Sequence, residues 1–352
     1  YRKEATGSLN DEILRNLHER LLYLRNLEDK KKQVLSSIEE QGKLTEELKK
    51  SILEAQTLVV VEDLYRPYRP KRRTRATIAK EKGLEPLANL ILLQMTDKSI
   101  EEEAESYVSE EKEVKNVKEA IAGASDILAE SVADEADYRI RIRNMTVKSG
   151  SVVSSAKKEN EKSVYEMYYD FEEPISKLAG HRVLALNRGE KEKILTVKIN
   201  APEEEILSWL KRQVIRTDNP NTTPILEAVL EDSYKRLIAP AIEREIRNDL
   251  TEKAEDGSIK VFGKNLEQLL MQPPIKGQTV LGWDPAFRTG CKLAVVDPTG
   301  KVLDTGVIYP APPHKKIGEA KALLKDWVAR YGIEIIAIGN GTASKESEIF
   351  IA

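Results

Sequence analysis

The sequence predicts a multidomain protein, with a mainly α-helical region over residues 1–274 followed by an α/β domain over residues 275–352. Over most of the first region, apolar residues recur at the three- and four-residue spacing of amphipathic helices. From residue 279 to residue 309 the pattern changes to short apolar runs separated by Gly and Pro turns, which is typical of strands. A Pro273-Pro274 pair and the following Lys276-Gly277 separate the two patterns, so we expect the domain boundary there.

Residues 9–56 predict a helical hairpin. Asn10 and Thr45 are suitable N-caps, and Gly42 separates the two helices. The first helix carries a stripe of leucines at helical spacing: Leu14, Leu17, Leu21, Leu24 and Leu27. The stripe could form a coiled coil with a partner, but a position facing the core is favoured in a chain of this size.

The segment 66–75 gathers basic residues around two prolines. Pro67 and Pro70 predict an extended backbone that does not join a helix. The expected nucleic-acid-binding residues are Arg66, Tyr68, Arg69, Lys71, Arg72, Arg73 and Arg75. Cations neutralise phosphates, and tyrosines such as Tyr65 and Tyr68 can stack on unpaired bases. Pairing of the arginines with acidic helices of the same chain is an alternative of equal weight.

Residues 80–180 predict further helices, with an acidic run at 101–105 as a solvated face. Within them, Arg139, Arg141 and Arg143 form a second cationic group beside Tyr138. This group could extend a track for phosphates, but a salt-bridged helix end is favoured.

Residues 181–200 predict a β-hairpin, because two apolar runs flank a turn that contains Gly189. Helices are expected after Pro202 and after Thr222, with a bend at Pro240. A further helix is expected near residues 261–271, ending at the proline pair.

The second domain reads as three short strands over 279–309, an amphipathic helix over 315–331 and an apolar strand over 333–338. This order is the opening of an RNase H-like domain. Asp284 lies in the first strand, where such domains can hold a divalent metal. Asp284 is therefore the candidate catalytic and metal-binding residue of this domain.

A single carboxylate does not suffice for two-metal hydrolysis of a phosphodiester, which needs several converging acids. The fourth strand leads into residues 339–342, Gly-Asn-Gly-Thr, which carry no acid. Glu319, on the intervening helix, and Glu346 and Glu348, after this loop, are possible substitute ligands, and Asp297 reads as a turn residue. The loop 339–344 suits either a phosphate-binding turn or a plain connection from strand to helix.

The charge balance excludes attraction to nucleic acid through net charge. The 352 residues include 56 Lys and Arg and 59 Asp and Glu, a formal net charge of −3, so contact with a polyanion needs local basic patches.

One cysteine, Cys291, excludes a disulfide framework, and the three histidines lack metal-ligand spacing. No apolar run is long enough to span a bilayer, so we expect a cytoplasmic protein with no membrane partner.

Several separate segments resemble the Tex family of bacterial transcription accessory proteins. They are residues 62–80, 83–88, 181–189, the strands around Asp284 with 288–292, and 338–344. They occur in the order of the family, and the resemblance covers essentially the whole chain. Two departures stand near Asp284: Ala286, where the family usually has glycine, and the bulky Trp283.

The resemblance implies a helical region with a helix-turn-helix-like element, then a YqgF domain of the RNase H and RuvC type. It also implies helix-hairpin-helix and OB-fold domains that this chain lacks, a first residue inside the helical region and a last residue inside the YqgF domain. The expected function is a nucleic-acid-binding transcription accessory factor that acts as a non-catalytic scaffold on RNA or DNA, with RNA polymerase as a candidate partner and no cofactor. The alternative is a metal-dependent RuvC-like or RNase H-like nuclease or resolvase that uses Asp284 and Mg²⁺.

Overall fold

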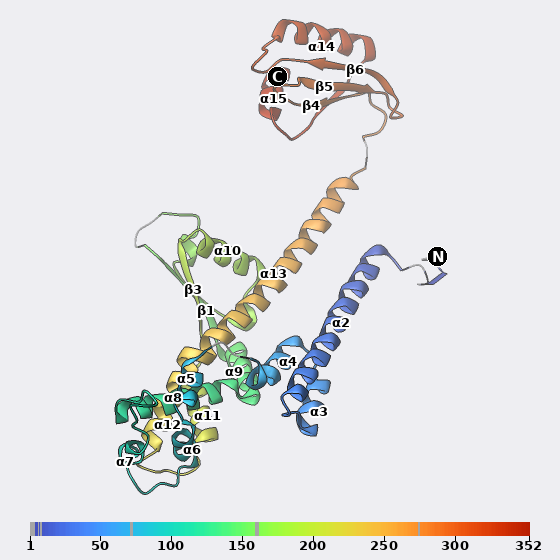
Figure 1. The fold of residues 1–352 in the computed structure, drawn as a ribbon. Helices are drawn as coiled ribbons and strands as arrows, with labels where there is room; N and C mark the ends of the chain where they lie inside the picture. The colour runs from blue at the N-terminus through green and yellow to red at the C-terminus, as the bar shows by residue number, and fades with distance from the viewer. Residues whose placement is uncertain (1–3, 6, 8, 71–72, 159–161, 274) are drawn as a thin grey trace. The chain divides into compact units, whose positions relative to one another are not determined.

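The fold is described from a computed structural model, which describes residues 1–352 except 1–3, 6, 8, 71–72, 159–161 and 274 (Figure 1). The chain forms two compact units, residues 1–261 and residues 262–352. The first unit is mainly helical and the second is α/β, as predicted. In the described part of the chain, no helix is long and apolar enough to cross a membrane.

The predicted N-terminal hairpin is present as α2 (Asp11–Glu40) and α3 (Glu46–Glu54). Both predicted caps form: the side chains of Asn10 and Thr45 accept hydrogen bonds from the backbone N–H groups of Ile13 and Leu48. The hairpin packs with α4 (Leu58–Tyr65) around a core of Leu27, Val34, Ile38, Ile52, Ala55 and Val61.

The favoured prediction that the leucine stripe of α2 faces the core is wrong for most of the stripe. Of its five members only Leu27 is buried, whereas Leu17, Leu21 and Leu24 are exposed. The buried residues of α2 all lie at or after Leu27, because α3 and α4 pack on the second half of this helix. Periodicity identifies an apolar face but does not show whether anything covers it.

Helix α8 (Val117–Asp134) lies at the centre of the first unit and contacts the helices around it. These are α5 (Arg75–Glu81), α6 (Glu85–Leu93), α7 (Ile100–Glu105), α9 (Ala136–Ser149) and α12 (Thr223–Asp232), with α11 (Glu203–Val214) packing on α9 and α12. Gly123 allows the close approach of α5 and α8, because a Cβ atom there would lie 2.4 Å from Leu84 Cδ1 and 3.2 Å from Ala79 Cβ.

The prediction of further helices over residues 80–180 is wrong at its end. A three-stranded antiparallel sheet with the order β2-β1-β3 consists of β1 (Ser151–Ala156), β2 (Asp170–Pro174) and β3 (Leu195–Asn200). Strand β1 is rich in serine and β2 is acidic, so neither has a strong intrinsic preference for strand. Their conformation depends on pairing between segments that are distant in the sequence.

The predicted hairpin over 181–200 is also wrong in its first half, which forms α10 (Gly180–Lys191). Val183 and Leu186 are buried at helical spacing, and β3 pairs with β1 rather than with its neighbour in sequence. Gly189 lies inside the helix rather than in a turn. A Cβ atom at this position would lie 2.6 Å from Leu195 Cδ1, so glycine serves close packing between α10 and β3.

The predicted bend at Pro240 takes the form of a π-helical segment, Ser233–Ile238, between α12 and α13 (Ala239–Leu270). The N–H group of Ala239 donates to Tyr234 O, five residues earlier, so the wider turn lies directly before the proline that lacks an N–H group. The helix predicted near 261–271 is the last part of α13. The predicted domain boundary at 274/275 lies between α13 and the first strand of the second unit.

A buried ion-pair network joins α4, α9 and α13. The Arg139 side chain is 0% exposed; its Nε donates to Asp63 Oδ1 at 2.7 Å and its Nη2 donates to Glu245 Oε1 at 2.8 Å. Arg143 Nη2 donates to both carboxylates, at 2.7 Å in each case. The salt-bridged reading favoured for this cationic group is therefore confirmed for Arg139 and Arg143, while Arg141 is exposed.

The second unit has the predicted order of strand, strand, strand, helix and strand. Strands β4 (Val280–Asp284), β5 (Cys291–Val296), β6 (Val302–Ile308) and β7 (Ile335–Ile338) form a sheet with the order β6-β5-β4-β7, and β4 and β7 are parallel. Helix α14 (Ile317–Tyr331) packs on the sheet through Trp327. A Cβ atom at Gly306 would lie 2.9 Å from the Trp327 ring, so glycine makes room for this indole.

Replacing Asp63 with alanine is expected to destabilise the first unit by about 3–5 kcal/mol, because the buried Arg139 then loses a counter-charge. Urea unfolding followed by circular dichroism measures this loss. Asp249→Ala is the control, because Asp249 pairs with Lys253 on an exposed helix face and its removal should cost little. Equal stability of the two variants would contradict the assigned role of the network.

Candidate nucleic-acid interface

The basic segment 66–75, which we call the arginine loop, connects α4 to α5. Its backbone corrects the prediction of an extended segment. Arg66, Pro67 and Tyr68 form a 3₁₀ helix, and Arg75 is the first residue of α5. Proline is tolerated in the first turn of a helix, where its missing N–H group would have no intrahelical partner. Arg69 is extended, with φ −65° and ψ 128°.

The start of α5 is set by the sequence at the end of the arginine loop. Thr74 and Thr77 form a reciprocal capping box: each hydroxyl oxygen accepts from the backbone N–H group of the other residue, at 3.1 and 2.7 Å. The Thr74 hydroxyl also donates to Glu130 Oε2 of α8 at 2.9 Å. Thr74, near the end of the loop, is thus attached to the central helix of the first unit.

The two tyrosines of this region pack against the N-terminal hairpin. Tyr65 and Tyr68 lie on its hydrophobic core, and the hydroxyls of Tyr65 and Ser37 share a hydrogen bond of 2.9 Å. The Tyr68 carbonyl accepts from Gln41 Nε2 at 2.9 Å. The geometry thus differs from the expected free stacking platform, because both rings are partly covered by α2.

The arginines of the loop divide into an inner and an outer set. Arg66 is half-buried, and its Nε donates to Asp134 at 3.2 Å. Arg69 and Arg73 are outer residues, 66% and 72% exposed, with carboxylates at 3.7 and 3.3 Å in Glu62 and Glu81. Such exposed pairs contribute little stability, so both guanidinium groups remain available to a competing phosphate.

Two further predicted contacts, Lys71 and Arg72, lie outside the described residues. Arg75 is exposed at the start of α5, and no ion pair of its side chain is recorded in the described part of the chain. Burial raises the pKa of the Asp126 carboxyl, and the positive charges of Arg236 and Arg75 act in the opposite direction. Internal pairing, one of the two alternatives of the sequence, is therefore present at Arg66, Arg69 and Arg73, while Arg69, Arg73 and Arg75 are also exposed at the surface.

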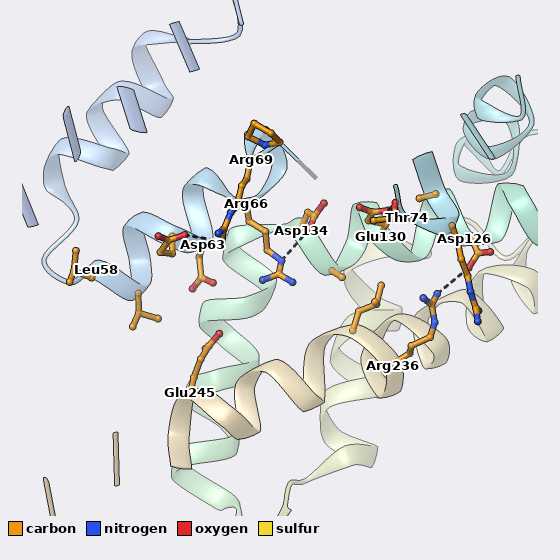
Figure 2. A pocket seen from close by; sticks show the side chains of 17 residues that line it. Leu58, Asp63, Arg66, Arg69, Thr74, Asp126, Glu130, Asp134, Arg236 and Glu245 are labelled. Atoms are coloured by element: carbon orange, nitrogen blue, oxygen red, sulfur yellow. Dashed lines mark hydrogen bonds and ion pairs between the residues drawn. The ribbon is translucent and has the colours of Figure 1, made fainter. Parts of the chain in front are cut away.

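A hollow of about 780 Å³ between α4, α5, α8 and α13, which we call the arginine pocket, is lined by Arg66, Arg69 and Arg75 of the loop and by Arg236 (Figure 2). Arg66 and Arg236 reach into it, each paired with an aspartate of α8, at 3.2 Å to Asp134 and 3.1 Å to Asp126. Leu58, Val59 and Leu237 form part of its apolar wall. Sequence reasoning did not identify this pocket, because Arg236 joins the arginine loop only through tertiary packing.

In the second unit, Asp284 is the last residue of β4 and is exposed. Its antiparallel neighbour on β5 is Lys292, and directly opposite residues share one face of a sheet. Across the described ranges, no group of three or more His, Cys, Asp or Glu side chains is arranged to hold a metal ion. The charged residue directly opposite the predicted metal ligand on β5 is a cation.

The other acids considered for a metal site have separate positions. Asp297 is the turn residue that the sequence predicts: hydrogen bonds from Thr299 and from the Lys301 backbone lower its pKa. Glu319 pairs with Lys316 on α14. Glu346 and Glu348 lie exposed on α15 (Ser344–Ile351), which follows the loop of residues 339–343.

Comparison with known proteins gives a consistent result along the chain. Residues 1–39 match the Tex-like protein N-terminal domain, residues 96–262 match the Tex central region-like family, and residues 278–352 match the Tex protein YqgF-like domain. The first two matches lie almost wholly in the first unit, and the third lies in the second unit.

Three relatives are similar over essentially all of this chain. Protein YdcI of Bacillus subtilis is 53% identical over 354 residues, which are 100% of this chain and 49% of the relative. Transcriptional accessory protein Tex of Neisseria gonorrhoeae is 39% identical, over 99% of this chain and 46% of its own length. The human S1 RNA-binding domain-containing protein 1 is 34% identical, over 100% of this chain and 36% of its own length. The chain spans about half the length of the bacterial relatives that it matches.

Substitution of Asp284 by asparagine is expected to leave Mn²⁺ affinity unchanged, because an isolated exposed carboxylate beside Lys292 is a weak site for a divalent ion. Isothermal titration of MnCl₂ into the wild type, the variant and an Asp326→Asn control checks this. Saturable Mn²⁺ binding that is lost only in Asp284→Asn would contradict the expectation and would support the nuclease alternative.

Proposed function

Since the chain belongs to the Tex family, we propose that it is the nucleic-acid-contacting helical part, with the adjoining YqgF-like domain, of a transcription accessory factor. The arginine loop contacts phosphates, and the YqgF-like domain acts as a non-catalytic scaffold. RNA and DNA are both candidate ligands, RNA polymerase is a candidate partner, and the cytoplasm is the proposed location.

The observation that carries this proposal is the exposure of Arg69 and Arg73 on a loop held at both ends. Both guanidinium groups lie at the surface, and their carboxylate partners among the described residues, Glu62 and Glu81, are themselves exposed, so these pairs are weak. A phosphate can replace such a partner with a charge-assisted bond, which an arginine can make in bidentate form. Because the net charge of the chain is −3, binding then depends on this local patch and not on a long-range field.

A non-catalytic role for the second unit is supported by the surroundings of Asp284. Two-metal hydrolysis requires several acids around the ions, and the described residues contain no such group. Lys292 beside Asp284 further disfavours a divalent cation at this position. We therefore propose that the unit needs no resident metal or other cofactor. Its role in the transcription accessory factor is then to provide a surface for contacts, as a non-catalytic scaffold.

Replacement of Arg69 and Arg73 by glutamate is expected to weaken binding of short single-stranded RNA and DNA strongly. It should also lower the slope of log affinity against log salt by about 0.7 for each lost phosphate contact. Fluorescence anisotropy of labelled oligonucleotides over a salt series measures both quantities.

The matched control is Arg188→Glu, which reverses an arginine of similar exposure, 75%, that pairs with Glu192 on α10. The control should bind like the wild type. An unchanged affinity and salt slope in the Arg69→Glu, Arg73→Glu double variant would remove the arginine loop from the interface.

A further inference from the structure

A separate cavity lies where the π-helical segment, Ser233–Ile238, meets α9, β3 and the start of α13. We call it the π-segment cavity. Its volume of about 360 Å³ is within the range of small-ligand sites, and Ile142, Ile199 and Ile242 give it an apolar wall. It lies outside the arginine loop, so a ligand bound here would add a site to the one in the proposed function.

Tyr234 brings an unused hydroxyl to this cavity. The side chain is 3% exposed, and in the described part of the chain its hydroxyl has no hydrogen-bond partner. This oxygen is not among the buried polar atoms that are sealed from solvent, so it is reached through the cavity. Burial raises the pKa of Tyr234 to about 12, so the hydroxyl keeps its proton at neutral pH and can both donate and accept.

The proline after the π-helical segment leaves a backbone carbonyl without a donor in this described helix. The Ala239 N–H group donates to Tyr234 O, five residues earlier. In the same register Lys235 O would accept from residue 240, but Pro240 has no N–H group. A helical carbonyl points toward the residues four and five positions later, and Ala239 and Pro240 line the cavity. The Lys235 carbonyl is therefore a second acceptor at this wall.

Glu243 supplies a carboxylate that is paired with no cation among the residues the structure describes. Its Oε1 accepts from the Ile199 backbone N–H group at 3.1 Å, which leaves Oε2 for another donor. The ammonium group of Lys235, which also lines the cavity, lies 3.2 Å from Glu203 and 2.6 Å from Glu231. Because these three carboxylates outnumber the one ammonium group, the local charge is negative.

The unused groups of the cavity are thus a carboxylate, a carbonyl and a hydroxyl, all of which accept hydrogen bonds. From this arrangement we propose that the π-segment cavity binds an aliphatic primary amine, with its ammonium group at Tyr234 and Glu243 and its carbon chain along the isoleucine wall. An ammonium group has three N–H donors and no acceptor. Methylene chains that carry such a charge pack on apolar surfaces while the charged end stays at polar groups. A free polyamine and a lysine side chain of a partner protein share this chemistry.

Titration of the whole chain with spermidine, and separately with Nα-acetyl-lysine amide, tests the site by NMR of isotope-labelled isoleucine methyl groups. The methyl signals of Ile142, Ile199 and Ile242 should shift until the site is saturated. Those of Ile52, in the core of the N-terminal hairpin, should not shift. Tetramethylammonium, a cation without an N–H donor, should leave all four signals in place.

Two conservative variants test the hydrogen bonds. Tyr234→Phe and Glu243→Gln should each weaken spermidine binding by about tenfold or more, as for loss of a hydrogen bond to a charged group. Tyr234→Phe keeps the buried ring, and Glu243→Gln keeps an oxygen that accepts from the Ile199 N–H group. The control Glu252→Gln removes the same charge from an exposed position of α13 and should bind like the wild type. The methyl spectrum of each variant shows whether it is folded.

The two amines distinguish the source of the ligand. Tighter binding of spermidine supports the site and indicates a free polyamine, whereas tighter binding of the lysine amide supports it and indicates a partner protein. The proposal is overturned if neither amine shifts the three methyl signals, or if tetramethylammonium shifts them equally. Equal affinity of the wild type and both conservative variants for spermidine would also overturn it.

Discussion

The ion pair between Arg139 and Asp63 is the contact on which the arrangement of the helical unit depends. Both side chains are buried, and Glu245 and Arg143 complete a network that joins α4, α9 and α13. Removing one partner of such a pair leaves a charge in a medium where its solvation is poor. The network therefore restricts the position of α4, and α4 leads directly into the arginine loop. Its carboxylates also form part of the wall of the arginine pocket.

The arginine loop shows how one cluster of cations serves two roles. Arg66 points inward and pairs with Asp134, where partial burial strengthens the attraction. Arg69 and Arg73 point outward, where water screens their pairs with Glu62 and Glu81. The inner contact and the capping box at Thr74 hold the loop, and the outer residues are free to exchange partners. A polyanion would meet a surface that is already organised, so less conformational entropy is lost on binding.

The second unit has the strand order of an RNase H-like domain, and among the residues that the structure describes no set of acids gathers around Asp284. The register of β4 and β5 places Lys292 opposite this aspartate. Close packing and one buried hydrogen bond stabilise the core of this unit. Gly306 leaves room for the Trp327 ring, and Trp283 Nε1 donates to the buried Ser347 hydroxyl of α15 at 3.1 Å. These contacts stabilise the unit as a folded module.

The sequence by itself determined the features whose causes are local. The caps at Asn10 and Thr45, the turn at Asp297, the strand order around Asp284 and the family all followed from adjacent residues and motifs. Only the tertiary structure decided which leucines of α2 are buried, that β1 and β2 are strands, that residues 180–191 are helical, and which arginines have acidic partners. In each of these cases the stabilising partner is distant in the chain, as Asp134 is from Arg66, and no local propensity encodes it.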